Sequence, residues 1–454
     1  MQYVSTRGKT PPMGFQDAVL TGLAPDGGLL VPATIPDVTP MLASWQGLSF
    51  VELAREIVLL FVDDIPREDL ERLITDAYAN FSHPEIAPLT KVGNVTVMEL
   101  FHGPTLAFKD VALQLLGQIF EYILAHENKH LNILAATSGD TGSAAIAGVR
   151  GLPQIDIFVM YPRGRVSHLQ ELQMTTEVAA NVHCLSVEGS FDDCQNLMKT
   201  IFEDLAFKEK YALGAANSVN WARVLAQIVY YGYASLKLGG ERPVSFCVPT
   251  GNFGNVFAGF TAKRMGFPIE RLILATNEND ILAKFFESGV YERGEVRYTV
   301  TPAMDIQVAS NFERFLYYHM DCDPVALGEF MADFARSGRA ELAAPLHTDD
   351  FLATAVSVDD TLSAIRTVYE TSGYVADPHT AIGLAAAERF ALEGPLVCLA
   401  TAHPAKFPDA VNKAVGEDVA RHPTLDSLCD RESRTTNVPA DIEAIKDVIR
   451  RLGH

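Results

Sequence analysis

Lys109 has an unusual setting for a lysine. It stands in FHGPTLAFKD (residues 101–110), directly after Leu106, Ala107 and Phe108. Most lysines are solvated surface charges, so an apolar setting needs an explanation. Desolvation and the positive end of a following helix both disfavour the ammonium form and favour a nucleophilic amine. Lys109 is therefore a candidate for covalent chemistry with a carbonyl group, with an ordinary surface lysine as the alternative.

A glycine-rich loop, GNFGN (residues 251–255), follows one apolar stretch and precedes a helical pattern. Backbone N–H groups at such a helix start form an anion site, and Gly251 and Gly254 would let the backbone close on a phosphate. A tight turn without a ligand is the alternative. The loop lacks the GK[ST] and GxGxxG patterns, so it is neither a Walker loop nor a dinucleotide loop.

Two further loops follow apolar stretches. SGDTG (residues 138–142) offers Ser138, Thr141 and main-chain donors to a carboxylate or phosphate, unless Ser138 or Asp140 simply caps the helix. TAHPAK (residues 401–406) is the third loop. Open α/β folds bind ligands at the carboxyl ends of parallel strands, which is where all three loops are expected. A buried lysine together with a phosphate loop suggests a Schiff-base lysine for pyridoxal phosphate.

The stretch HENKH (residues 126–130) matches the HExxH zinc pattern. That motif needs both histidines on one face of a continuing helix. Here the helix is expected to end among Asn128 and Lys129, and histidines at a helix C-terminus already have an electrostatic reason. We therefore predict no metal site.

The elements around the loops alternate between strand and helix patterns. Short, continuously apolar stretches are typical of buried parallel strands, and their alternation with helices indicates the α/β class. We expect an N-terminal region of residues 1–90, an α/β domain of residues 91–240 with Lys109, and another of residues 241–454 with the GNFGN loop. The expected strands are 94–101, 131–137, 155–162, 244–250 and 395–401.

The composition excludes several classes of function. The chain has 454 residues, 48% of them hydrophobic, and a formal net charge of −21. Such an acidic balance argues against nucleic acid or an anionic membrane as a partner. Six scattered cysteines without a CxxC fit a reducing cytoplasm. No run approaches a membrane span, and the first residues lack a signal-peptide core.

The motifs occur in an order that resembles the threonine synthases, specifically the longer form with an extra N-terminal region. The likeness covers nearly the whole chain. It implies the tryptophan-synthase-β-like fold (fold type II) of pyridoxal-phosphate enzymes, with two open parallel or mixed α/β domains and a small N-terminal domain. Besides FHGPTLAFKD, SGDTG, GNFGN and TAHPAK, the likeness rests on YVSTRG (3–8), NSVNWAR (217–223), MDIQVASNFERF (304–315) and ADPHTAIG (376–383).

The resemblance assigns the cofactor's contacts. Lys109 would hold pyridoxal phosphate as a Schiff base and then act as general base at Cα and Cβ of the substrate. A hydroxyl, that of Thr401, would face the pyridine nitrogen. The cofactor phosphate would be bound by Gly251, Asn252, Phe253, Gly254 and Asn255.

The resemblance also implies the reaction, conversion of O-phospho-L-homoserine and water to L-threonine and phosphate by β,γ-elimination and replacement, the last step of threonine biosynthesis. Arg223 is the first choice for the substrate phosphate, since guanidinium suits bidentate phosphate contact. Lys406 and Arg314 are second choices, and a surface ion pair is the alternative for Arg223. The remaining expected substrate contacts are Thr137, Ser138, Asp140 and Thr141 for the carboxylate, and Asn217 and Ser218 beside Arg223.

Two rival functions share these residues. A phospho-lyase on the same scaffold would release phosphate and 2-oxobutyrate, and a non-catalytic protein could have kept the fold. His102, His379 and His403 lie in ligand-facing motifs, although a hydrogen-bonded core histidine is as frequent. We expect a cytoplasmic monomer or homodimer.

Overall fold

The computed structural model describes residues 1–343, 346 and 349–453. Two sheets form its centre. The first has five parallel strands in the order β15-β7-β6-β5-β8, with β6 buried along its whole length. These strands are β5 (Leu131–Ala136), β6 (Ile155–Pro162), β7 (Val182–Glu188), β8 (Leu213–Gly214) and β15 (Thr436–Pro439).

The second sheet has six strands in the order β13-β10-β9-β14-β4-β3, and all neighbours are parallel except the β3–β4 hairpin. Parallel strands buried on both faces are continuously apolar, which is why these stretches could be found in the sequence. The α/β class is thereby confirmed. The strands are β3 (Leu89–Val92), β4 (Val95–Glu99), β9 (Val244–Pro249), β10 (Ile269–Thr276), β13 (Phe351–Ala355) and β14 (Leu396–Ala400).

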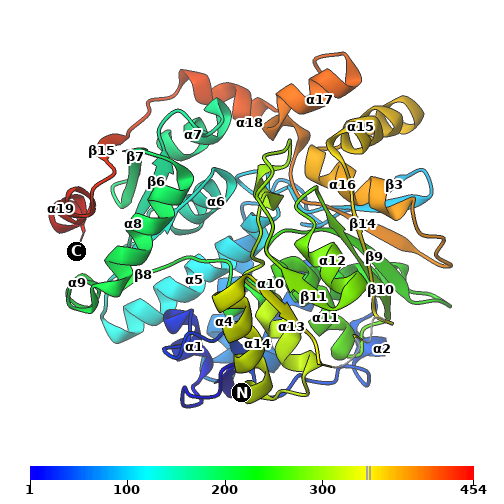
Figure 1. Cartoon of the computed structure of the whole chain (residues 1–454), viewed down its shortest axis with the longest axis horizontal. Coiled ribbons are helices and arrows are strands. Elements are labelled where there is room, and N and C mark those ends of the chain that lie inside the picture. The colour runs from blue at the N-terminus through cyan, green and yellow to red at the C-terminus, as the bar shows by residue number, and fades with distance from the viewer. Residues whose placement is uncertain (344–345, 347–348, 454) are drawn as a thin grey trace.

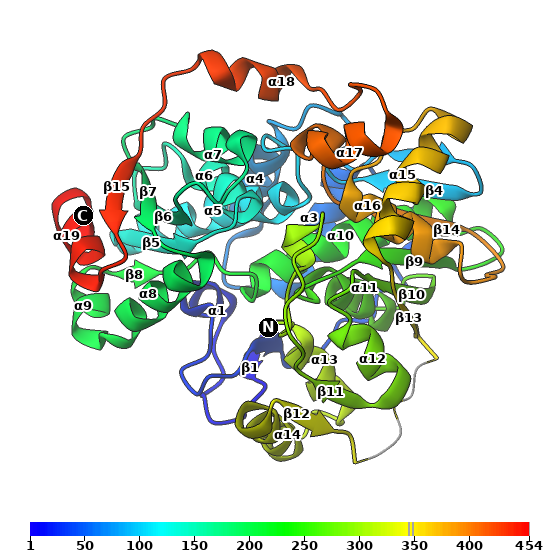
Figure 2. The same ribbon diagram turned by 45° about the horizontal axis from the view of Figure 1, so that its top comes forward.

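Sheet membership does not follow the chain order. The β4 strand, near residue 95, pairs with β14, near residue 400, and the C-terminal β15 pairs with β7 in the first sheet. Figures 1 and 2 show the red C-terminal segment running back across the molecule through α18 (Pro423–Asp426) to β15 and α19 (Ile442–Leu452). The division at residues 90 and 240 stays a prediction, and the pairing joins segments from both sides of it.

Helices α5 (Lys109–Glu127) and α6 (Asp140–Val149) approach each other closely. Gly117 and Gly148 permit the contact, because a Cβ on Gly117 would collide with the carbonyl oxygen of Gly148. The two helices begin at Lys109 and Asp140, so close packing helps bring these residues together.

The N-terminal region supports a third helix, α10 (Trp221–Leu238). The indole of Trp221 lies 6.0 Å from the ring of Tyr3 in β1 (Tyr3–Ser5) and 5.9 Å from that of Phe61 in α3 (Phe50–Phe61). Aromatic packing of this kind fixes a buried helix start. It positions Arg223, which follows two residues later.

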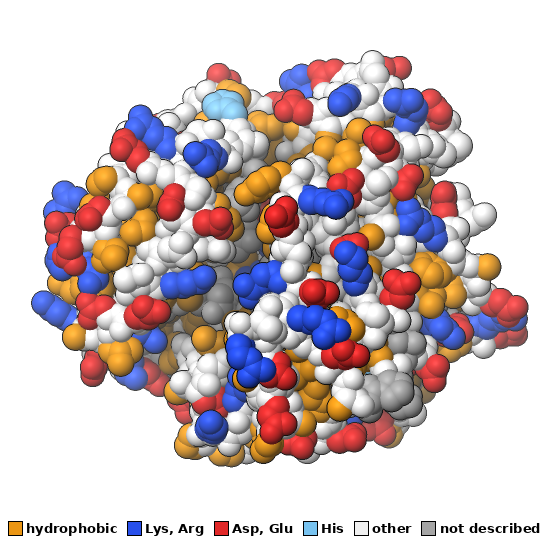
Figure 3. Space-filling model, viewed as in Figure 1, with side chains coloured by type: hydrophobic (Ala, Val, Ile, Leu, Met, Phe, Trp, Pro, Cys, Tyr) orange, Lys and Arg blue, Asp and Glu red, His pale blue; other side chains and the backbone are white. Residues whose placement is uncertain are grey.

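The surface agrees with the charge of the chain. On the face seen in Figure 3, lysine and arginine side chains are interspersed with aspartate and glutamate. In the part of the chain that the structure describes, no helix is long and apolar enough to cross a membrane.

Candidate active site

Lys109 is held at the carboxyl end of β14 by backbone pairing. The N–H of Phe108 donates to the carbonyl of Thr401 (2.9 Å), and that of His403 donates to the carbonyl of Leu106 (3.0 Å). Leu106 has a φ of 61°, a left-handed conformation that is strained for a side chain with a Cβ. The structure therefore brings together Lys109 and Thr401, which the sequence separates by almost 300 residues.

Asp140 lies between two lysines. Its Oδ2 is 3.6 Å from Nζ of Lys109, and its Oδ1 is 3.0 Å from Nζ of Lys406. Lys406 also donates to the carbonyl of Thr105 (2.7 Å), and Gln170 donates to Oδ1 of Asp140 (3.0 Å). The sequence did not single out Gln170 or Thr105. Gln170 lies in a separate helix, α7 (His168–Thr175), with no local pattern that marks it.

Burial and neighbouring charges set the protonation of this group. Burial lowers the pKa of Lys109, the positive charges of Lys406 and Arg223 lower it further, and Asp140 opposes them. Burial alone would raise the pKa of Asp140, but the charges of Lys406 and Lys109 hold it well below its usual range. Asp140 is thus a carboxylate at neutral pH, and the free amine of Lys109 is easier to form than that of an exposed lysine.

Arg223 is a buried cation whose hydrogen-bonding capacity is largely unused within the described part of the chain. Its side chain is 4% exposed, and its Nε and Nη1 have no hydrogen-bond partner in the described part of the chain. Burial lowers its pKa to about 10. The alternative of a surface ion pair therefore does not hold. Close by in sequence, Oδ1 of Asn217 is also unpartnered among the described residues, and the Ser218 hydroxyl lies 2.9 Å from that of Ser310.

Arg314 is equally buried, but each of its guanidinium nitrogens donates a hydrogen bond. Its guanidinium donates to the carbonyls of Leu30 (2.9 and 3.1 Å) and Val219 (2.5 Å) and to Oδ1 of Asn311 (2.5 Å). These bonds join the N-terminal region to the start of α10. Arg314 therefore has a structural role, and we do not propose that it binds phosphate.

The GNFGN loop connects β9 to α11 (Gly254–Arg264) and forms a cradle. Phe253 takes a left-handed conformation, with φ 62°. A Cβ on Gly251 would lie 3.0 Å from the carbonyl oxygen of Ala303, which leaves little room for a side chain. Asn255 is buried, and its Nδ2 finds no partner among the described residues. A backbone cradle with an unused amide donor at a helix start fits a phosphate group.

Two buried tyrosines orient that amide. The hydroxyls of Tyr230 and Tyr231 in α10 both donate to Oδ1 of Asn255, at 2.5 and 2.9 Å. Both donors bind the oxygen, so Nδ2 of Asn255 is left as the free donor. Helix α10 thereby supports the phosphate cradle and carries Arg223 as well.

The SGDTG loop is closed by Thr137. Its hydroxyl oxygen accepts from the N–H groups of Gly139 (3.0 Å) and Gly142 (2.9 Å). The N-cap of α6 is Gly139, with φ 140°, which has no side chain. The hydroxyl of Thr137 binds an N–H group of the first turn instead, so neither Ser138 nor Asp140 is the helix cap that the sequence offered as an alternative. Ser138 is exposed, whereas Thr141 is partly buried.

The HENKH stretch does not form a zinc site. Helix α5 ends at Glu127, Asn128 is left-handed, and His130 therefore lies outside the helix, 3.0 Å from Asp156. Among the residues that the structure describes, no group of three or more His, Cys, Asp or Glu side chains could hold a metal ion.

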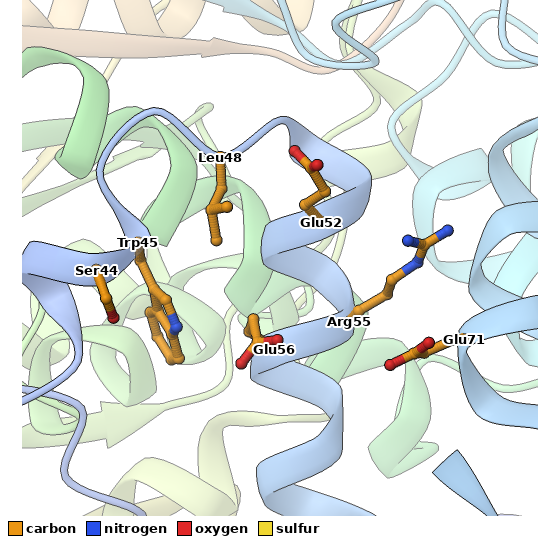
Figure 4. Close-up of a pocket in the computed structure, with 7 residues that line it drawn as sticks. All are labelled: Ser44, Trp45, Leu48, Glu52, Arg55, Glu56 and Glu71. Atoms are coloured by element: carbon orange, nitrogen blue, oxygen red, sulfur yellow. The ribbon is translucent and has the colours of Figure 1, made fainter. Parts of the chain in front are cut away.

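Two surface cavities lie outside the lysine cluster. The one in Figure 4, about 380 Å³, lies along α3 and is lined by Glu52, Glu56 and Glu71 among others, a poor setting for an anion. The other, about 360 Å³, borders the site, because Leu106 and His403 line it.

A buried lysine next to a hydroxyl at one strand end, with a glycine cradle at the neighbouring strand end, defines a pyridoxal-phosphate-dependent enzyme of fold type II. Residues 82–401 match the family described as pyridoxal-phosphate dependent enzyme. Residues 2–78 match the threonine synthase N terminus, and residues 380–449 the threonine synthase C-terminal family. The chain belongs to the threonine synthase family.

Known relatives and solved structures support the same family assignment. Threonine synthase of Pseudomonas aeruginosa is 45% identical over 464 residues, covering 100% of this chain and 99% of the relative. The crystal structure of pyridoxal-phosphate-bound threonine synthase from Brucella melitensis is 46% identical with a TM-score of 0.97 over 100% of both chains. That of Escherichia coli threonine synthase is 33% identical, with a TM-score of 0.83 over 99% of this chain and 100% of that one. The predicted family, fold and cofactor are confirmed.

Proposed function

We propose that this enzyme converts O-phospho-L-homoserine and water to L-threonine and phosphate. The observation that carries the proposal is the pair formed by Lys109 and Arg223. A buried amine with a lowered pKa stands within electrostatic range of a buried guanidinium, two of whose nitrogens have no hydrogen-bond partner among the described residues. An unpartnered buried cation is costly and calls for an anionic ligand. A substrate with a phosphate group supplies one.

The cofactor site is assigned to residues that fit it. When bound, pyridoxal phosphate supplies an aldehyde for the substrate amine and an electron sink for bond breaking beside that nitrogen. The cradle of residues 251–255 would hold its phosphate through backbone N–H groups and Nδ2 of Asn255. Thr401 would offer its hydroxyl to the ring nitrogen, and Lys109 would hold the aldehyde carbon.

Lys109 then moves protons on carbon. Its free amine would take protons from Cα and Cβ of the substrate while phosphate leaves Cγ, and would give them back to Cγ and Cα before the product departs. The carboxylate of Asp140, 3.6 Å from Nζ, tethers the freed side chain and stabilises its protonated form. The opposing charge of Lys406 limits that effect, so the amine can give its proton up again.

The substrate is held from two sides. Arg223, with Asn217 and Ser218, would bind its phosphate by charge-assisted hydrogen bonds. The SGDTG loop, through Thr137, Ser138 and Thr141, would bind its carboxylate at the start of α6. Lys406 is fully buried and already bound to Asp140 and a carbonyl, so we assign it to the charge of the site rather than to direct phosphate contact.

We further propose that the enzyme works in the cytoplasm as a monomer or homodimer. The scattered free cysteines support a reducing compartment. Sedimentation analysis of the purified holoenzyme would measure the oligomeric state.

Product analysis tests the reaction. The purified protein is incubated with pyridoxal phosphate and O-phospho-L-homoserine while phosphate, threonine and 2-oxobutyrate are measured together. Threonine in a one-to-one ratio with phosphate is the expected result. Phosphate with 2-oxobutyrate would instead indicate a phospho-lyase, and release of no phosphate would contradict the substrate assignment.

The covalent assignment has a separate test. Borohydride reduction of the holoenzyme, followed by peptide mapping, should place the cofactor on Lys109. Label on Lys406 or another lysine would disprove the role given to Lys109, whatever the products are.

A further inference from the structure

Gln170 is a buried residue of α7 whose side chain binds the carboxylate between the two lysines. It is 6% exposed, and its Nε2 donates to Oδ1 of Asp140 at 3.0 Å. The other end of the amide is also used, because the hydroxyl of Ser167 donates to Oε1 at 3.1 Å. An ionised carboxylate can only accept, so the amide must present its nitrogen to Asp140. Gln170 thus supplies Asp140 with a donor that adds no charge.

Two donors from different parts of the fold bind the same oxygen of Asp140. Besides Gln170, the ammonium of Lys406 lies 3.0 Å from Oδ1, whereas Oδ2 lies 3.6 Å from Nζ of Lys109. A single donor would let the carboxylate turn about that contact, but donors from two directions fix its plane. Gln170 and Lys406 together therefore keep Oδ2 turned toward Lys109.

Gln170 also packs on the loop that precedes Asp140. Gly139 has φ 140°, and a Cβ there would lie 2.5 Å from Cδ of Gln170. The amide therefore lies directly over the backbone of the SGDTG loop, and only glycine leaves room for it. Helix α7 packs against α6, which begins at Asp140. Gln170 thus contacts both the carboxylate of Asp140 and the backbone just before it.

Helix α7 is held in place by neighbours other than Asp140. Gln173, one turn after Gln170, donates to the carbonyl of Thr105 at 3.1 Å. An apolar row of α7 also packs against the turn before Lys109 and against the C-terminal segment. The members of this row and their partners are Leu169, Leu172, Leu106, Ala405, Leu425 and Leu428. The helix therefore does not depend on Gln170 for its position, and Gln173 offers a matched control.

We propose that Gln170 is a positioning residue for Lys109, because its amide fixes the Asp140 carboxylate that serves as counter-ion to the Lys109 amine. This inference rests on the proposed function, in which Lys109 moves protons on carbon. A counter-ion in a fixed place holds the protonated amine in one orientation between proton transfers, and small displacements of such groups are costly to the rate. Gln170 acts only through Asp140 and touches no reacting atom.

Other charges also act on this pair of residues. Besides each other, the charged or titratable groups within electrostatic range of Lys109 or Asp140 are Lys406, Arg223 and His379. Asp110, which follows Lys109 in the chain, acts on Lys406 in turn. The hydrogen bond from Gln170 helps to lower the pKa of Asp140, as the two lysines do. A variant that turns this neutral donor into a titratable group therefore gives a pH-dependent signal against a constant background.

Two variants of Gln170 test the inference in the holoenzyme. Gln170→Leu removes the donor at every pH, and we expect kcat for threonine formation to fall about 10- to 100-fold, the effect of a misplaced catalytic group. In Gln170→Glu, the protonated carboxyl can donate to Oδ1 as the amide does, whereas the ionised carboxyl repels Asp140. The rate of this variant relative to the wild type should fall as the pH rises, by up to about tenfold for each pH unit once the carboxyl ionises.

A control and a second readout separate positioning from a structural role. Gln173→Leu removes an amide of the same helix that does not contact Asp140, and it should keep the wild-type pH profile. In the cofactor-free full-length chain, competitive labelling with acetic anhydride and peptide mass spectrometry measure the apparent pKa of Lys109. Gln170→Glu should raise that pKa by about 1, because an added negative charge stabilises the ammonium form. Recovery of cofactor absorbance on adding pyridoxal phosphate reports that each preparation is folded.

Several results would overturn the inference. A wild-type rate in Gln170→Leu would show that Lys406 alone positions Asp140. Equal losses at every pH in both Gln170 variants, with the pKa of Lys109 unchanged, would make Gln170 a structural residue, and so would an equal loss in Gln173→Leu. If Gln170→Leu fails to fold, the pH profile of Gln170→Glu decides. A wild-type enzyme that makes no threonine would overturn the proposed function itself, and the labelling result is independent of it because it needs no substrate.

Discussion

Arg223 and Arg314 form a natural pair for testing which buried charge serves a ligand. Both are arginines buried by the same fold, but Arg314 donates four hydrogen bonds, whereas two nitrogens of Arg223 have no partner in the described part of the chain. The perturbation is replacement of each by methionine, which has a similar length and no charge. We expect the replacement at Arg223, but not that at Arg314, to stabilise the holoenzyme in the absence of inorganic phosphate.

The magnitude for Arg223 follows from its pKa. Burial lowers that pKa from its ordinary value to about 10. At about 1.36 kcal/mol per pKa unit, the difference corresponds to about 3 kcal/mol of destabilisation by the buried charge. Because folded and unfolded states are both charged below pH 10, this cost is constant around neutral pH. Arg223→Met removes it and should raise the free energy of unfolding by about 1–3 kcal/mol, as other buried-charge replacements do.

For Arg314, lost hydrogen bonds offset the gain from removing the charge. Burial lowers its pKa to about 9, so removal of the charge alone would return about 5 kcal/mol at about 1.36 kcal/mol per pKa unit. Arg314→Met leaves the carbonyls of Leu30 and Val219 and the amide oxygen of Asn311 without their donor. At roughly 1–3 kcal/mol for each of these three buried groups, the loss is about 3–9 kcal/mol, so it offsets that gain and Arg314→Met should not be more stable than the wild type. Most of the loss would weaken attachment of the N-terminal region to α10.

Thermal unfolding of the holoenzymes, with and without inorganic phosphate, is the assay. The Tm of Arg223→Met should rise by a few degrees without phosphate, and that of Arg314→Met should not rise. Inorganic phosphate should stabilise the wild type and Arg314→Met. Its Kd for Arg223→Met should be about 10- to 100-fold higher than for the wild type, because that variant loses one charge-assisted hydrogen-bonded contact. Equal losses of Tm in both variants, with phosphate stabilising both alike, would refute the reasoning.

Two other predictions concern the cofactor cradle and the pH dependence of stability. Gly251→Ala places a Cβ 3.0 Å from the carbonyl oxygen of Ala303. The variant should bind pyridoxal phosphate about 10-fold more weakly in an absorbance titration. An unchanged affinity would show that Gly251 does not contribute to the cofactor site. Burial lowers the pKa of His403 to about 4. As the pH drops, His403 is therefore protonated in the unfolded chain before it is protonated in the folded protein. The free energy of unfolding should fall by up to about 3 kcal/mol as the pH drops from 6.5 to 4. His403→Gln should flatten that slope in urea titrations across this range; an unchanged slope would assign the acid sensitivity to other groups.

The sequence predicts the parts of the site that are local. Strand, glycine loop and helix start lie within about ten residues for GNFGN and SGDTG, so their placement needed no tertiary information. The pairing of residues 106–108 with 401–403 is non-local, and only the resemblance linked Lys109 to Thr401 before the structure did. The sequence ranked Arg223 above Arg314 for phosphate binding but gave no reason to exclude Arg314. The difference lies in acceptors such as Leu30, which come from a distant part of the chain.

The same tertiary contacts explain how an acidic protein can bind anions. The chain carries a net charge of −21, yet Lys109, Lys406 and Arg223 lie within electrostatic range of one another, with Asp140 against both lysines. Asp110 also lies within electrostatic range of Lys406, and burial raises its pKa. The cluster still has more basic than acidic side chains in a buried, low-dielectric space, where each charge acts more strongly than in water. The carboxylate of Asp140 offsets the repulsion between the two lysines when no ligand is bound. No carboxylate offsets the charge of Arg223 among the contacts described above. Under the proposed function, the phosphate of the substrate would supply the missing counter-charge at Arg223.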